Sequence, residues 1–243
     1  TIHPPDRISA LRPAPIEVEL VPPPGIAVTA TIRAIVRTPD GEQYQSFDLQ
    51  PAGDNRYVAT EPLQLPLYAE GDWRLDVIVQ SRLRVSGERQ LLFRPDPVRC
   101  RDLSEVIPQT VEVCVPEDFV EVAAQGDQVA GARVWRYGNG ELGLWWAPGP
   151  AEPLLFNNAL VMLEATFGLN APIVQNVEER AWQGRTAFLF HEDWGGAEGG
   201  PGEALVIQGP DRWLYVLRVR ALDGGEIPAW LRMVGETFIF AEG

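Results

Sequence analysis

The sequence predicts two domains of different class: an all-β sandwich in residues 1–97 and an α+β domain in residues 98–243. In the first half, short runs that alternate apolar and polar residues are separated by turn signals, and no segment has helical periodicity. In the second half, similar runs are interrupted by a long segment with helical spacing. A chain of 243 residues is long for one domain and sufficient for two.

The first half reads as a series of short strands joined by turns. Residues 1–24 are rich in proline and are expected to form an extended arm that leads into an edge strand. TPDGEQ, residues 38–43, is a hairpin turn signal. This close spacing of short strands is typical of an immunoglobulin-like β-sandwich. The expected strands are residues 26–36, 44–50, 56–66, 71–80 and 86–95.

The second half keeps the strand-like alternation but also predicts helices. In AEPLLFNNALVMLEATFGLN, Pro153 suits the first turn of a helix and Gly168 its C-terminal cap. A second, shorter helix is expected within residues 225–236. Strands with a helix or two on one or both faces form an α+β layered domain. Apolar residues at helical spacing are Leu155, Phe156, Ala159, Leu160, Leu163 and Phe167, and the expected strands are residues 109–119, 131–137, 141–148, 173–182, 184–193, 203–209, 212–222 and 237–240.

The boundary between the domains is expected in RPDPVRCRDL, residues 94–103, where two prolines coincide with a change in charge. Residues 1–99 hold 13 acidic residues and 11 arginines (−2), and residues 100–243 hold 21 and 9 (−12), which together give the net charge of −14. The strongly acidic second half argues against nucleic acid and against an anionic membrane surface as partners.

The two cysteines bear on the cellular compartment. Cys100 and Cys114 either form a disulfide or are two buried free thiols, and we predict that they pair. A disulfide implies an oxidising, extracytoplasmic compartment. The chain begins at Thr1 and has no apolar run near the roughly 18 residues of a membrane helix. We therefore expect a leader or membrane anchor to lie outside this chain.

The stretch FLFHEDWGGAEGGPGEALVI, residues 188–207, combines His191 with acids, Trp194 and glycines. A zinc site needs three or four ligands, and the other histidine, His3, lies on the proline-rich arm. The glycines lack the lysine and the following helix of a phosphate-binding loop. We therefore predict no metal, no cofactor and a mobile surface loop at residues 195–202 between two antiparallel strands.

Catalytic signatures are lacking in the sequence. There is no G-x-S-x-G elbow, and no serine adjoins His191. The acidic pairs Glu117–Asp118, Glu178–Glu179 and Glu192–Asp193 are expected to be solvated surface groups. A hydrolase with its site near His191 remains an alternative that only a spatial triad would support.

Tryptophans supply the candidate interaction surface. Trp145 and Trp146 are adjacent, so on a strand they face opposite sides. Together with His191 and Trp194 they are the candidate residues for binding a protein or carbohydrate. The alternative is a sheet covered by helices on both faces, which would bury both adjacent tryptophans.

Four segments of the second half carry a resemblance to a known family: VEVCVPEDF, VEERAWQGRTAFLF, DRWLYVLRV and VGETFIF. In kind and order they resemble the PsbP-like α/β/α sandwich, which is shared with the Mog-type Ran-binding proteins, over Thr110 to Phe240. That family has no shared catalytic residues, so the resemblance implies a fold and no reaction.

NRYVATEPLQLPLYAEGDWRLDVIV in the first half resembles the YtkA-like and FixH-like extracytoplasmic sandwiches. Some of those proteins are linked to copper, although this chain lacks methionine- and histidine-rich segments. We therefore expect a non-enzymatic extracytoplasmic module that binds a protein or carbohydrate or serves in assembly. The alternatives are the hydrolase and copper handling by the first domain.

Overall fold

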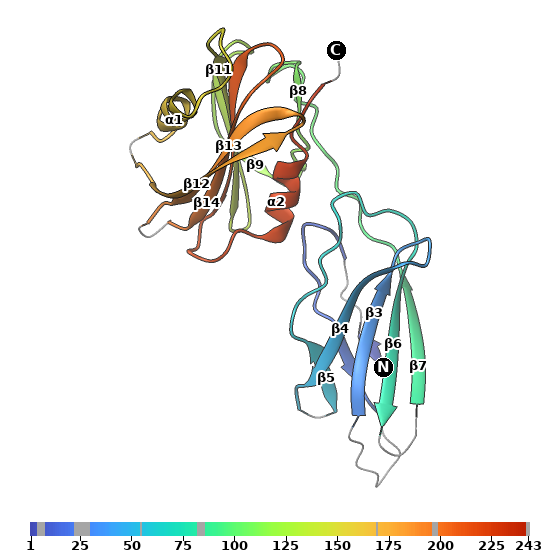
Figure 1. Ribbon diagram of the computed structural model, residues 1–243. Coiled ribbons are helices and arrows are strands. Elements are labelled where there is room, and N and C mark those ends of the chain that lie inside the picture. Colours follow the sequence, from blue (N-terminus) through green and yellow to red (C-terminus); the bar gives the residue numbers. More distant parts are fainter. Residues whose placement is uncertain are drawn as a thin grey trace. The chain divides into compact units, whose positions relative to one another are not determined.

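The structure is a computed structural model that describes residues 1–3, 8–21, 30–53, 55–81, 86–168, 170–195 and 199–241. The chain divides into two compact units, Thr1–Val98 and Arg99–Gly243 (Figure 1). The described part of the first unit contains strands and no α-helix, and both helices of the described chain lie in the second unit. The predicted composition of the chain, mostly strands with few helices, is therefore confirmed.

The first unit is built on one seven-stranded sheet in which every pair of neighbours is antiparallel. In β3, alternate residues Ile32, Ala34 and Val36 are fully buried, as expected for a strand with one face on the core. Residues 26–29 of the strand expected here lie outside the described residues. In spatial order the strands are β1 (Ile2–His3), β2 (Glu17–Glu19), β5 (Arg56–Ala59), β4 (Gln43–Pro51), β3 (Ala30–Arg37), β6 (Trp73–Ser81) and β7 (Ser86–Phe93).

Two irregular segments, residues 8–16 and 61–69, contribute to the same core as the sheet. They meet at Ala14 and Leu63, whose backbone groups exchange hydrogen bonds of 2.9 and 2.8 Å. The strand expected over residues 56–66 ends at Ala59, and most of the remaining residues belong to the second irregular segment. Pro62 and Pro66 account for this difference, because proline has no N–H to donate to a strand ladder.

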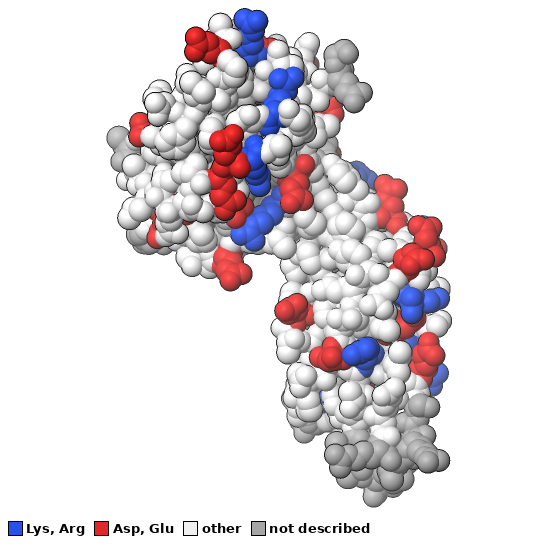
Figure 2. Space-filling model, in the orientation of Figure 1, with Lys and Arg blue, Asp and Glu red and all other residues white. Residues whose placement is uncertain are grey.

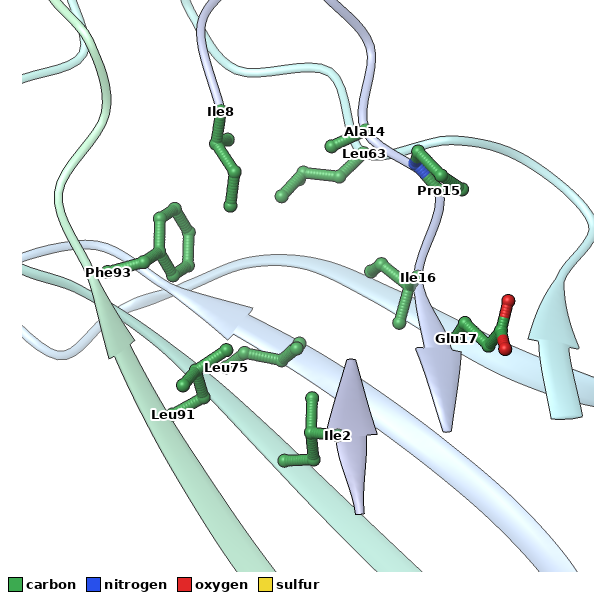
Figure 3. A pocket seen from close by; sticks show the side chains of 10 residues that line it. All are labelled: Ile2, Ile8, Ala14, Pro15, Ile16, Glu17, Leu63, Leu75, Leu91 and Phe93. Atoms are coloured by element: carbon green, nitrogen blue, oxygen red, sulfur yellow. The ribbon is translucent and has the colours of Figure 1, made fainter. Parts of the chain in front are cut away.

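A small apolar gap of about 20 Å³ remains inside the first unit (Figure 3). Ile2 of β1 and Ile16, just before β2, line it on one side, and Leu75 of β6 and Leu91 of β7 line it on the other. In Figure 3 the carboxylate of Glu17 points away from these side chains. A gap of this size and lining suits neither a polar ligand nor a large one, so we interpret it as imperfect packing.

The second unit is built on another antiparallel seven-stranded sheet, and a short pair of strands, β8 (Val111–Glu112) and β16 (Ile239–Phe240), lies apart from it. The edge strand β9 was not among the expected strands, and all seven of its residues, VEVAAQG, are exposed. In spatial order the strands are β12 (Ile173–Trp182), β13 (Arg185–Asp193), β14 (Pro201–Gln208), β15 (Trp213–Ala221), β11 (Gly140–Pro148), β10 (Gly131–Tyr137) and β9 (Val120–Gly126).

The two helices, α1 (Phe156–Glu164) and α2 (Ala229–Glu236), cover opposite faces of this sheet (Figure 1). Since successive strand residues point to opposite faces, β15 places Val216 in the core cluster under α1 and Val219 against Gly235 of α2. Among the described residues, no helix is long and apolar enough to cross a membrane.

A loop joins two antiparallel strands as expected, but it is shorter than residues 195–202, because Pro201 and Gly202 belong to β14. β13 and β14 pair antiparallel and are joined by residues 194–200. Residues 196–198 lie outside the described residues, so the expected mobility of residues 195–202 stays a prediction.

Cys100 and Cys114 form a disulfide in the structure, with their Cα atoms 5.1 Å apart. Free-thiol titration of the denatured, non-reduced protein is therefore expected to find no thiol. Replacing both cysteines by serine should lower the free energy of unfolding by about 3 kcal/mol, because the cross-link restricts the unfolded chain. Two reactive thiols in the parent protein would contradict the pairing and weaken the extracytoplasmic assignment.

Candidate functional site

The structure separates the two adjacent tryptophans that the sequence proposed for an interaction surface. Trp146 is 1% exposed, and its indole nitrogen donates a 2.8 Å hydrogen bond to the backbone oxygen of Asp127. It therefore belongs to the core and cannot present a binding surface. Trp145 points to the α1 face and is partly buried, as is Trp194. Both faces of the sheet are covered by a helix, which was the alternative expectation.

Trp145 and Trp194 meet at a buried arginine. The guanidinium carbon of Arg218 lies 4.8 Å from the ring centre of Trp145 and 5.0 Å from that of Trp194. Arg218 donates to both carboxylate oxygens of Glu192, at 2.8 and 3.0 Å. The Trp194 indole also donates to Glu192, at 3.0 Å. The sequence-based interpretation of Glu192 as a solvated acid was wrong, because its strand position points into this cluster.

We interpret this arginine–tryptophan cluster, made of Trp145, Glu192, Trp194 and Arg218, as structural. The side chains of Arg218 and Glu192 are only 3% and 0% exposed. Burial lowers the pKa of the Arg218 guanidinium, and the charge of Glu192 opposes that change. Arg218 also donates to the hydroxyl of Thr166, just beyond α1. The cluster thus joins the sheet, the end of α1 and the start of the 194–200 loop.

A glycine makes room for one ring of this cluster. A Cβ atom on Gly143 would lie 2.2 Å from the ring of Trp145. Gly143→Ala is therefore expected to displace Trp145 and lower the free energy of unfolding by about 1–3 kcal/mol. Gly87→Ala is the control, because a Cβ atom added there would meet no atom within 4 Å and the φ of Gly87 is not positive. Equal effects of the two substitutions in urea unfolding would contradict this packing.

His191 lies on the other face of the sheet, between two carboxylates. Its Nε2 atom is 3.3 Å from Glu178 and its Nδ1 atom is 4.0 Å from Glu203. The described hydrogen bonds of the ring include no serine, threonine or cysteine, so no triad is assembled there. Within the same described ranges, no group of three or more His, Cys, Asp or Glu side chains is placed to hold a metal ion.

A pocket of about 120 Å³ opens beside α2, close to Glu203 and His191. We call it the α2-side pocket. Its floor is aliphatic, and its walls carry charged groups from β12 and from α2. The floor is made of Leu189, Leu205, Leu217 and Val219, and the remaining lining residues are Arg180, Trp182, Glu203, Arg232, Gly235 and Glu236.

The pocket exists because α2 is short. With eight residues, α2 contacts mainly β15 and β11. The neighbouring strands β13 and β14 turn Leu189 and Leu205 toward the same side, and there the helix leaves an opening. Apolar side chains from three adjacent strands therefore form one surface next to the helix.

The two walls of the pocket differ in how their charged side chains are paired. On the β12 wall, the guanidinium of Arg180 lies 5.2 Å from the ring centre of Trp182. The buried indole nitrogen of Trp182 has no hydrogen-bond partner in the structure. On the α2 wall, Arg232 forms a 3.0 Å ion pair with Glu203. Figure 2 shows one face of this unit, and basic side chains lie beside acidic ones on that face too.

A second depression of about 380 Å³ lies beside α1. It is open and is lined by Val161, which is 67% exposed, together with Met162, Ala165, Leu214 and a proline. The described lining includes two asparagines and no charged side chain. This α1-side groove has fewer polar groups that could orient a ligand than the α2-side pocket.

No protein-family model and no curated protein sequence matches the chain. The structure is similar to the solution structure of cyanobacterial PsbP (CyanoP) from Synechocystis sp. PCC 6803, with a TM-score of 0.40 and 14% identity, over 55% of this chain and 88% of that chain. It is also similar to a cycloalternan-degrading enzyme from Trueperella pyogenes in complex with isomaltose, with a TM-score of 0.28 and 13% identity; 91% of this chain is covered, and the chain spans 30% of that enzyme.

A further similarity is to carbohydrate-binding modules of the β-sandwich superfamily, with a TM-score of 0.25 and 9% identity, over 93% of this chain and 91% of that chain. All three TM-scores are below 0.5, and all three identities are below 25%. The similarity to CyanoP is structural and covers about half of this chain, and no sequence family is shown. None of these similarities carries an argument about what this chain binds.

Proposed function

We propose that the chain is a non-catalytic binding or assembly module that acts outside the cytoplasm, and that the α2-side pocket is its docking site. The observation that carries the proposal is an aliphatic floor with oriented polar groups on both walls, which is the usual composition of a ligand site. The Cys100–Cys114 disulfide supports the compartment.

Of the two partner classes that the sequence left open, a protein suits this pocket better than a carbohydrate. The floor consists of leucine and valine side chains, which accommodate an apolar side chain. The one aromatic ring of the lining, Trp182, has the guanidinium of Arg180 over it. Its face is therefore less available for stacking on a sugar.

We also infer the finer fold assignments from the order of the elements. One helix on each face of an antiparallel sheet supports a PsbP-like α/β/α sandwich for the second unit. The strands of the first unit and its irregular segments around one core support an immunoglobulin-like sandwich. The hydrolase and copper alternatives have no supporting arrangement among the described side chains.

Arrays of immobilised peptides and glycans, probed with the full chain, test this function. We expect peptide binding that is lost in Leu189→Phe, which fills the pocket from its floor. The control is Ala165→Leu, which changes the α1-side groove at an exposed position. Binding that persists in Leu189→Phe but is lost in Ala165→Leu would contradict the assignment of the site. Glycan binding lost in Leu189→Phe would replace the protein partner by a carbohydrate.

A further inference from the structure

We propose that the α2-side pocket recognises an apolar side chain that adjoins a carboxylate, with the carboxylate directed to Arg180 on β12. This inference rests on the proposed function and names the chemistry of the ligand. A peptide segment with an aliphatic or aromatic residue next to an acidic residue, or at a chain terminus, has that chemistry.

The floor sets the apolar part of the ligand. Leu189, Leu205 and Leu217 are 7%, 3% and 5% exposed, so the floor is firmly packed. A cavity of about 150 Å³ lined by such residues holds a benzene ring. The α2-side pocket, at about 120 Å³, is therefore sized for one aliphatic side chain or a small ring.

The β12 wall sets the position of the carboxylate. Arg180 is exposed, and its contact in the structure is the ring of Trp182. No carboxylate of a described residue forms an ion pair with it, whereas Arg232 is paired with Glu203. A ligand carboxylate would supply Arg180 with an acceptor, because a guanidinium can only donate.

The α2 wall sets the direction of the ligand. Glu236 is exposed at the end of α2 and lines the pocket, whereas the carboxylate of Glu203 is paired with Arg232. A ligand carboxylate beside Glu236 would be repelled by it, and a carboxylate at Arg180 would avoid that repulsion. Neutralising Glu236 should therefore strengthen binding of an anionic ligand, and neutralising Arg180 should weaken it.

Three probes that share the isobutyl side chain of leucine separate charge from apolar fit. N-acetyl-leucine carries a carboxylate beside the isobutyl group, N-acetyl-leucinamide is neutral, and leucinamide is a cation. Binding to the full chain is measured by saturation-transfer NMR at about 0.15 M salt, where screening over roughly 8 Å reduces the influence of the net charge. We expect N-acetyl-leucine to bind about tenfold more tightly than its amide, as for one added charge-assisted hydrogen bond.

The variants assign that difference to the pocket. Arg180→Gln is expected to remove the preference for the carboxylate and leave weak binding of the neutral amide. Glu236→Gln is expected to strengthen binding of N-acetyl-leucine by a few fold. Leu189→Phe is expected to abolish binding of all three probes, and its thermal melting checks that the unit is folded.

Two outcomes separate this inference from the proposed function. If the three probes bind equally, or if leucinamide binds best, and Leu189→Phe abolishes that binding, the carboxylate specificity is wrong and the pocket remains a binding site. If no probe binds, or if binding is unchanged in folded Leu189→Phe, the inference and the proposed docking site are both overturned.

Discussion

Replacing Glu192 by glutamine is expected to lower the free energy of unfolding of the Arg99–Gly243 unit by about 3–5 kcal/mol. The substitution leaves the guanidinium of Arg218, which is 3% exposed, without its bidentate partner. The indole nitrogen of Trp194 also loses a charged acceptor. Urea unfolding, followed by tryptophan fluorescence, measures the change.

The control for this prediction is Glu178→Gln. Glu178 is 54% exposed and lies 3.3 Å from His191, so its neutralisation should change stability by less than about 1 kcal/mol. Replacing Glu192 and Arg218 together by leucine and methionine should recover part of the loss, because no unpaired charge then remains buried. An effect of Glu192→Gln no larger than that of Glu178→Gln would contradict the buried ion pair.

Leu75→Ala is expected to lower the free energy of unfolding of the Thr1–Val98 unit by about 4 kcal/mol. Leu75 is 6% exposed and already borders the apolar gap shown in Figure 3. Truncation would join the lost volume to that gap, and the cost of such substitutions rises with the residual cavity. Differential scanning calorimetry of the full chain measures the shift.

Leu92→Ala is the matched control, because Leu92 is 69% exposed on the neighbouring strand β7. It should leave the transition within about 0.5 kcal/mol of the parent. We expect the Leu75→Ala shift to be confined to one of two thermal transitions, since the chain divides at Val98. A single transition that moves as a whole would show that residues 98–243 do not fold independently of residues 1–97.

The class of each half follows from local patterns, which is why the sequence predicts it well. Alternation at Ile32, Ala34 and Val36 marks a strand regardless of its neighbours. Helical spacing through Ala159 and Leu163 predicts α1, and both residues are buried. Such signals lie within a few residues of each other along the chain, so no tertiary information is needed to read them.

The candidate site depends on which residues of neighbouring strands lie opposite one another, and the sequence alone does not specify this register. Trp145 and Trp146 are the same residue type at adjacent positions, and only the pairing of β11 with β15 decides which one meets Arg218. Glu192 looks like any surface acid until β13 is placed in the sheet. The sequence did not predict the α2-side pocket for a related reason. Strands with both faces covered appear as continuous apolar runs such as LYVL, residues 214–217, and such a run does not show which of its side chains face a pocket.

A crystallographic fragment screen of the full chain would test the docking site most directly. Fragments should include acids, neutral amides and amines on comparable apolar rings, together with monosaccharides. We predict that bound fragments concentrate in the α2-side pocket, with an apolar group on Leu189, Leu205 and Leu217. An α2-side pocket left empty while fragments collect in the α1-side groove or in the first unit would contradict the proposed binding function of this pocket.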